Sequence, residues 1–115
     1  MSYLLLLLTF SSNGFDERHY QKLIQEEIGG ISEYRLDDGT RVDILLTRRA
    51  AEIDWDYKWA EGVGQATYYS LKTNRAPLVI LLIDNDRYER YQKRVEYCGI
   101  ECWIYDTRTL KFLNR

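Results

Sequence analysis

The chain has 115 residues, which is enough for one small domain with a single core and too few for two. Hydrophobic residues make up 45% of it and charged residues 30%, an ordinary globular composition that excludes a disordered or repetitive chain. The 16 basic and 18 acidic residues leave a formal net charge of −2, which argues mildly against tight, nonspecific binding of DNA through overall charge.

An apolar segment and a turn, residues 1–14, precede a domain expected over residues 15–115. The run from Tyr3 to Phe10 contains five consecutive leucines and is far shorter than the ~20 residues of a membrane span. It is interpreted as a buried strand or a helix laid against the core. A cleaved secretory signal is the minor alternative, because no basic side chain precedes the run and no A-x-A site follows it. The protein is therefore expected in the cytoplasm.

A first helix is predicted after the N-cap residue Asp16, and it ends at Ile28 before the Gly29-Gly30 pair. Its apolar stripe consists of Tyr20, Leu23, Ile24 and Ile28. Glu27 falls on this stripe, so it is either an auxiliary site residue or an ordinary charge at the edge of the stripe.

Three strands follow the first helix. Residues 31–36 are predicted as a strand, the Asp-Gly signal in residues 37–40 as a hairpin turn, and residues 41–46 and 50–55 as two more strands. Because side chains alternate along a strand, Glu52 and Asp54 share one face. If the second hairpin closes at Thr47 and Arg48, Asp43 lies opposite Glu52. Glu33, on the first strand, is placed as an auxiliary acid facing the same side.

Carboxylates gathered this closely on one sheet face repel one another, so they need a cation, raised pKa values or open water between them. The group consists of Asp43, Glu52 and Asp54. Oxygen ligands suit a hard divalent ion, and Mg²⁺ is commonly held by one or two carboxylates together with water and a substrate phosphate. The sequence therefore predicts a magnesium site.

A second helix is predicted from Lys58 to about Leu71. Helical spacing puts Lys58, Gly62, Gln65 and Tyr69 on one stripe. The neighbouring arc is more apolar and is expected to pack on the sheet; its members are Trp59, Ala60, Val63, Ala66, Thr67 and Leu71. Glycine costs a helix roughly 1 kcal/mol relative to alanine, so Gly62 and Gly64 indicate a close approach by backbone or substrate.

The remaining elements complete a mixed sheet between helices. Residues 78–83 are an apolar run typical of a strand buried on both faces, residues 87–97 an amphipathic helix, residues 101–105 a strand, and residues 110–113 a short edge segment. The last helix carries a basic arc, Arg87, Arg90, Lys93 and Arg94, which is either a solvated face or a surface for DNA phosphates. Cys98 and Cys102 lack metal-site spacing and are expected to be buried free thiols.

The order of Asp43, Glu52, Asp54, Lys58 and Gln65 on strand, strand and helix resembles the PD-(D/E)XK nuclease superfamily. In this resemblance Asp43 matches the acid of the second core strand, Glu52 the acid of the E-x-K element and Gln65 a glutamine of the next helix. Asp54 stands where the lysine is expected, and Lys58 is similar to lysines that other members draw from a neighbouring element. Small members that read GG-x-x-E, DGTRVD and E-x-D-x-x-x-KWAE-x-x-GQ are similar throughout.

The resemblance implies a single α/β domain with an αβββαβ restriction-endonuclease-like core. It also implies a hydrolase that cuts DNA phosphodiester bonds with Mg²⁺ or Mn²⁺ held by Asp43, Glu52 and Asp54. Lys58 would orient the attacking water and Gln65 would steady the site. A nuclease this small would form a homodimer or recognise structure more than sequence. The alternative is an inactive module of the same fold that binds nucleic acid or assembles with protein, in which Lys58 pairs with Asp54.

Overall fold

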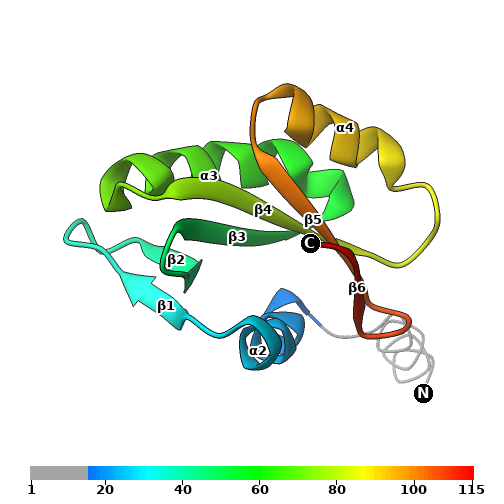
Figure 1. Cartoon of the computed structure of the whole chain (residues 1–115), viewed down its shortest axis with the longest axis horizontal. Coiled ribbons are helices and arrows are strands. Elements are labelled where there is room, and N and C mark those ends of the chain that lie inside the picture. Colours follow the sequence, from blue (N-terminus) through cyan, green and yellow to red (C-terminus); the bar gives the residue numbers. More distant parts are fainter. Residues whose placement is uncertain (1–15) are drawn as a thin grey trace, which may run out of the picture.

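The computed structural model describes residues 16–115, so the expectations for residues 1–14 lie outside the described residues. The chain forms one α/β domain with a mixed six-stranded sheet, as predicted. The helices cover both faces of the sheet, α2 on one side and α3 with α4 on the other (Figure 1). In chain order the elements are α2 (Glu17–Ile28), β1 (Ile31–Arg35), β2 (Arg41–Leu45), β3 (Arg49–Trp55), the 3₁₀ turn η1 (Asp56–Lys58), α3 (Trp59–Thr73), β4 (Ala76–Ile83), α4 (Glu89–Tyr97), β5 (Glu101–Asp106) and β6 (Lys111–Asn114).

The strands lie in the sheet in their sequence order, from β1 to β6. β3, β4 and β5 are parallel neighbours, and the β1–β2, β2–β3 and β5–β6 pairs are antiparallel. Each parallel connection runs through a helix, α3 after β3 and α4 after β4, and both helices lie on the same face. Two right-handed crossovers that advance in one direction along a sheet give this arrangement.

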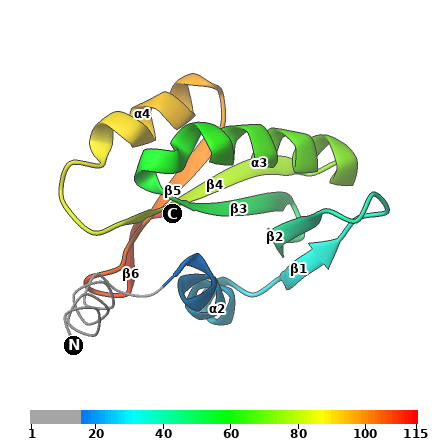
Figure 2. The same cartoon turned by 180° about the vertical axis from the view of Figure 1, so that it is seen from behind.

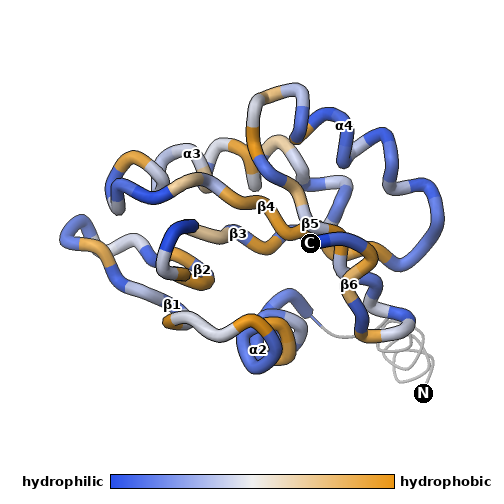
Figure 3. The backbone as a smooth tube through the Cα atoms, in the orientation of Figure 1, coloured by the Kyte–Doolittle hydropathy of each residue, from blue (hydrophilic) through white to orange (hydrophobic). Residues whose placement is uncertain are grey.

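β4 forms the centre of the core. Its residues from Leu78 to Ile83 are buried on both faces, as predicted, and much of its tube is coloured as hydrophobic in Figure 3. On one face Leu78, Ile80 and Leu82 pack with α2, and on the other Val79, Leu81 and Ile83 pack with α3 and α4. The sheet is therefore fixed by two separate apolar layers.

Both predicted hairpins form. In the first, the amide of Leu36 donates to the Thr40 carbonyl at 2.8 Å, and Gly39 takes a positive φ of 89° that favours glycine. In the second, the amide of Leu46 donates to the carbonyl of Arg49 at 2.8 Å, so the turn closes at residues 47 and 48. The predicted N-cap is also confirmed, because the Asp16 carboxylate accepts from the amide of His19 at 3.1 Å.

The predicted packing face of α3 is confirmed in part, because Ala66 is buried and Trp59 and Val63 pack against the core, but other members of the predicted arc are exposed. Gly62, Ala66 and Tyr69 are its buried residues, whereas Leu71 is 77% exposed and Thr67 is also exposed. The face of α3 that meets the sheet therefore combines Gly62 and Tyr69 with Ala66 of the apolar arc. The physical reason is that this face covers both the apolar side chains of β4 and the Asp54 carboxylate, which lies against Gly62.

The two cysteines differ in burial. Cys102 is a buried free thiol whose pKa burial raises to about 12, as expected, but Cys98 is exposed because it lies beyond the last turn of α4. None of the helices in residues 16–115 is long and apolar enough to cross a membrane.

Candidate functional site

Acidic side chains from β2 and β3 meet under α3. The pairing of Ile44 with Ala51 continues to place Asp43 beside Glu52, as predicted. The Asp43 carboxylate accepts from the amide of Ile53 at 2.8 Å, and Glu52 accepts from the amide of Asp43 at 3.4 Å. These cross-strand hydrogen bonds fix both acids at the point where the two strands separate.

Asp54 lies further along β3 on the same face as Glu52. The alternate residues Ala51 and Ile53 belong to the core under α2, so Glu52 and Asp54 point toward α3. Both carboxyl side chains are buried, with 3% and 5% of their residue surface exposed. The structure thus brings together the three acids that the sequence singled out.

A fourth acid, Glu17, joins them from α2. After burial, the charge of Glu17 is the main factor that raises the pKa of Asp54, and the two carboxyls are close enough to share a proton. Sequence reasoning missed Glu17, because an acid in the first turn of a helix is usually explained by the helix dipole. Only the crossing of α2 under the sheet shows where this residue lies.

Burial raises the pKa of the three strand acids, Asp43, Glu52 and Asp54. The pKa of Asp43 rises to about 6, that of Asp54 to about 8, and that of Glu52 to about 10, where the neighbouring Asp43 charge adds to the effect of burial. The site therefore holds protons at neutral pH, and a bound cation would replace them. This is the electrostatic behaviour expected where carboxylates share a buried position without a counter-charge.

The Oδ2 atom of Asp54 has no hydrogen-bond partner in the described chain, although it is buried. A buried charge without a partner is costly, so the atom requires a proton or a cation. It lies against Gly62 of α3, where a Cβ atom would come within 2.9 Å of it. Gly62 therefore has the close approach that the sequence indicated. Gly64 has none, because a Cβ there meets nothing within 4 Å.

The acids do not form a complete metal cage. Within residues 16–115, no group of three or more histidine, cysteine, aspartate or glutamate residues is arranged to hold a metal ion. Magnesium, however, is commonly bound through one or two carboxylates, with water and a phosphate as the other ligands. The buried Asp54 oxygen and the adjoining Asp43–Glu52 pair fit this partial, substrate-completed type of site.

Lys58 and Gln65 are exposed on the start and middle of α3. Lys58 makes no ion pair within the described residues, so the Lys58–Asp54 salt bridge that the inactive-module alternative expected does not form. Gln65 follows Gly62 by three residues and precedes Tyr69 by four, so it lies on the same side of the helix as both. Both side chains are exposed and therefore accessible to a ligand.

The two predicted auxiliary acids differ in position. Glu33 lies near Asp43 and contributes to its raised pKa. It has a strained positive φ of 54°, and its carboxylate accepts from Gln21 Nε2 at 2.8 Å and pairs with Arg18 and Arg41 at 3.5 and 3.8 Å. The same Gln21 amide donates to the Asp43 carbonyl at 3.1 Å, which ties α2 to the acidic strands.

Glu27 lies elsewhere. It is ten residues beyond Glu17 on α2, or about 15 Å along the helix axis, and its carboxylate pairs with Arg115 at 3.3 Å beside β6. Glu27 is therefore a flanking charge, the second of the two interpretations that the sequence allowed.

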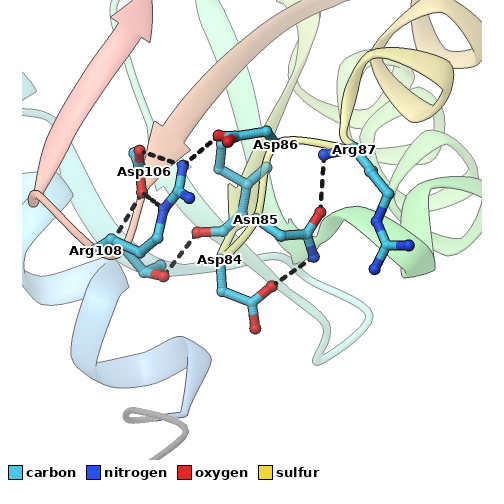
Figure 4. Close-up of polar contacts among 8 residues, drawn as sticks. Asp84, Asn85, Asp86, Arg87, Asp106 and Arg108 are labelled. Carbon is cyan, nitrogen blue, oxygen red and sulfur yellow. Dashed lines mark hydrogen bonds and ion pairs between the residues drawn. The ribbon is translucent and has the colours of Figure 1, made fainter.

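A further polar group at the ends of β4 and β5 is internally neutralised (Figure 4). Asp106 is buried, and the Arg108 guanidinium donates to both of its oxygens at 3.0 Å and to Asp86 at 2.8 Å. These hydrogen bonds from Arg108 lower the pKa of Asp106. The group closes the loop after β4 and offers no unpaired carboxylate comparable with Asp54.

The predicted basic arc is exposed, and its members form no ion pair with any described carboxylate. Arg90, Lys93 and Arg94 lie on α4, whereas Arg87 lies in the loop before the helix, which begins at Glu89. α4 lies beside the first turn of α3 in both ribbon views (Figures 1 and 2). The arc is therefore on the same face of the sheet as the acids.

No family model, curated protein or solved structure matches the chain.

Proposed function

We propose that the protein is a metal-dependent nuclease that hydrolyses phosphodiester bonds in DNA. The observation that supports this function most is the buried, unpartnered Oδ2 of Asp54 among acids whose pKa values are raised. An arrangement that only stabilised the fold would pair such an oxygen or replace it by an apolar group. A cation site explains why three acids are kept there.

The residues divide into four roles under this proposal. Asp43, Glu52 and Asp54 hold Mg²⁺ or Mn²⁺, which when bound supplies Lewis-acid stabilisation of phosphate charge and lowers the pKa of a coordinated water. Lys58 is an exposed ammonium group that orients the attacking water or donates to a phosphate oxygen. Gln65 contacts the water or the backbone of the strand. Glu17 and Glu33 adjust the charge of the cluster.

The experiment is an incubation of the protein with single-stranded, duplex and branched DNA, with Mg²⁺, Mn²⁺ or EDTA. Wild-type protein should cleave at least one substrate only when the metal is present. Asp43→Asn and Glu52→Gln preserve side-chain volume and should abolish cleavage, whereas Glu27→Gln should leave it unchanged. Circular dichroism of each variant checks the fold. Equal cleavage by Glu52→Gln and wild type would reject this site.

A second candidate function is an inactive module of the same fold that binds nucleic acid or assembles with protein. It is favoured by one observation: Asp54 stands at the position where the resembling nucleases carry lysine. Binding of DNA without cleavage under every metal condition would support this function over hydrolysis.

A further inference from the structure

Stacked cations and aromatic rings form a continuous strip from α4 to the start of α3. The Arg90 guanidinium lies 4.9 Å from the centre of the Tyr91 ring. The Arg94 guanidinium lies 5.6 Å from the Tyr91 ring and 5.5 Å from the Trp59 ring. Because Trp59 directly follows Lys58, the strip ends beside the lysine of the candidate site.

The cations of the strip are available to a ligand. Other arginines are committed to carboxylates: Arg49 pairs with Glu101 at 2.7 Å, and Arg108 with Asp86 at 2.8 Å. The strip, defined as Tyr57, Lys58, Trp59, Arg87, Arg90, Tyr91, Lys93 and Arg94, contains five cations that have no such partner in residues 16–115. In Figure 3 the α4 tube is hydrophilic along most of its length.

Tyr57 is the exposed aromatic residue of the strip. It lies in η1 between Asp56 and Lys58, and 63% of its surface is accessible. Burial raises the pKa of Asp56, and the charge of Arg90 partly offsets the rise, which places α4 next to this turn. η1 also contacts both α3 and α4. An accessible ring is thus held among unpaired cations at the edge of the acidic site.

We propose that this strip binds single-stranded DNA and leads it into the acidic site. The inference rests on the proposed function and specifies its substrate as an unpaired strand. Aromatic faces stack only on bases that are not already stacked within a duplex, and base–ring stacking combined with a cationic track is the usual means of binding single strands. A duplex would use the cations alone, and the overall charge of −2 gives it little additional attraction.

The test is fluorescence anisotropy in EDTA, so that binding is measured without cleavage. The probes are a labelled strand of about 16 nucleotides and the duplex of the same sequence. Wild-type protein should bind the single strand more tightly. Tyr57→Ala should weaken single-strand binding about five- to tenfold and leave duplex binding unchanged, and Tyr57→Phe should retain wild-type affinity because the ring remains.

Two variants test the cations. Lys93→Ala should reduce the slope of log affinity against log salt by about 0.7. Arg94→Lys keeps the charge but loses the planar stack, so it should weaken single-strand binding with an unchanged slope. The matched controls are Tyr97→Ala, a ring 94% exposed at the last residue of α4, and Lys22→Ala, an exposed cation on α2 across the sheet; both should bind as wild type.

Several results would overturn the proposal: no binding, equal or tighter binding of the duplex, no effect of Tyr57→Ala, or an equal effect of Tyr97→Ala. The cleavage assay separates this inference from the proposed function. Binding that behaves as expected without any cleavage supports the strip and rejects the nuclease. Cleavage that persists after the loss of Tyr57 without a change in affinity rejects the strip alone.

Discussion

Alanine substitutions at two glycines of α3 should have opposite effects on stability. An alanine in a helix interior is favoured over glycine by about 1 kcal/mol. At Gly64 the new methyl group meets nothing within 4 Å, so Gly64→Ala should raise the free energy of unfolding by about that amount. At Gly62 the methyl group would come within 2.9 Å of Asp54 Oδ2, and overpacking of this kind costs about 1–3 kcal/mol. The net effect of Gly62→Ala should lie between no change and a loss of about 2 kcal/mol.

A double-mutant cycle identifies the cause of the difference. When Asp54→Ala removes the carboxylate, the nearest remaining neighbour of the new methyl group is Val79 Cγ1 at 3.5 Å, an ordinary contact. Gly62→Ala should then become stabilising by about 1 kcal/mol in that background. The coupling energy between the two positions should therefore be about 1–3 kcal/mol.

Urea unfolding in EDTA at pH 7, followed by circular dichroism, measures all of these free energies. Gly64→Ala is the matched control for helix propensity, since both positions belong to the same helix. The reasoning is refuted if Gly62→Ala stabilises the protein as much as Gly64→Ala does, or if the effect of Gly62→Ala is the same with and without the Asp54 carboxylate. Either result would mean that Asp54 does not lie against α3.

Three other predictions follow from the acids and their neighbours. The raised pKa of Glu52 keeps this residue protonated in the folded state, whereas the unfolded chain releases its proton, so the free energy of unfolding should fall as pH rises from 5 to 8, by up to about 1.4 kcal/mol per pH unit for each such acid. Urea unfolding at each pH should show a shallower fall for Glu52→Gln than for wild type, and parallel curves would contradict this prediction. Glu17→Gln should change the metal or pH dependence of cleavage, whereas Glu27→Gln should not. Cleavage assays from pH 6 to 9 measure this difference, and identical profiles for the two variants would show that Glu17 is not part of the site. Arg108→Ala removes the two guanidinium hydrogen bonds to the buried Asp106 carboxylate and leaves only the one from the backbone amide of residue 108, so it should lower the free energy of unfolding by about 1–3 kcal/mol. An unchanged thermal midpoint would show that the pair is not formed.

Local patterns predicted the acidic strands well. Side chains alternate along β3, so Glu52 and Ile53 lie on opposite faces of the sheet. The two-residue turn after Leu46 sets the register that brings Asp43 alongside Glu52. Both features depend on backbone geometry over a few residues, which sequence periodicity and turn chemistry report directly. The anomaly of Gly62 was also readable, because glycine in a helix interior requires a reason.

The orientation of α3 and the role of Glu17 were not readable. Apolar residues occur around much of α3, so periodicity favoured an arc that contains the exposed Leu71 over the stripe that contains Gly62 and Tyr69. The orientation of the helix was decided by the surface on which it packs, where the Asp54 carboxylate lies beside the apolar side chains of β4. Glu17 lies near Asp54 only through the tertiary placement of α2, a relation that leaves no local signal.

Calorimetric titration of Mn²⁺ into the protein at pH 8 tests the central claim most directly, and it needs no assumption about substrate. Wild-type protein should bind with a dissociation constant of about 1 mM or below, and it should release protons, because the ion displaces those held by Glu52 and Asp54. Titrations in two buffers of different ionisation enthalpy measure that release. Binding should be lost in Glu52→Gln and retained in Glu27→Gln. Absence of binding in the wild type, or equal binding by Glu52→Gln, would contradict the assignment of these acids as a metal site.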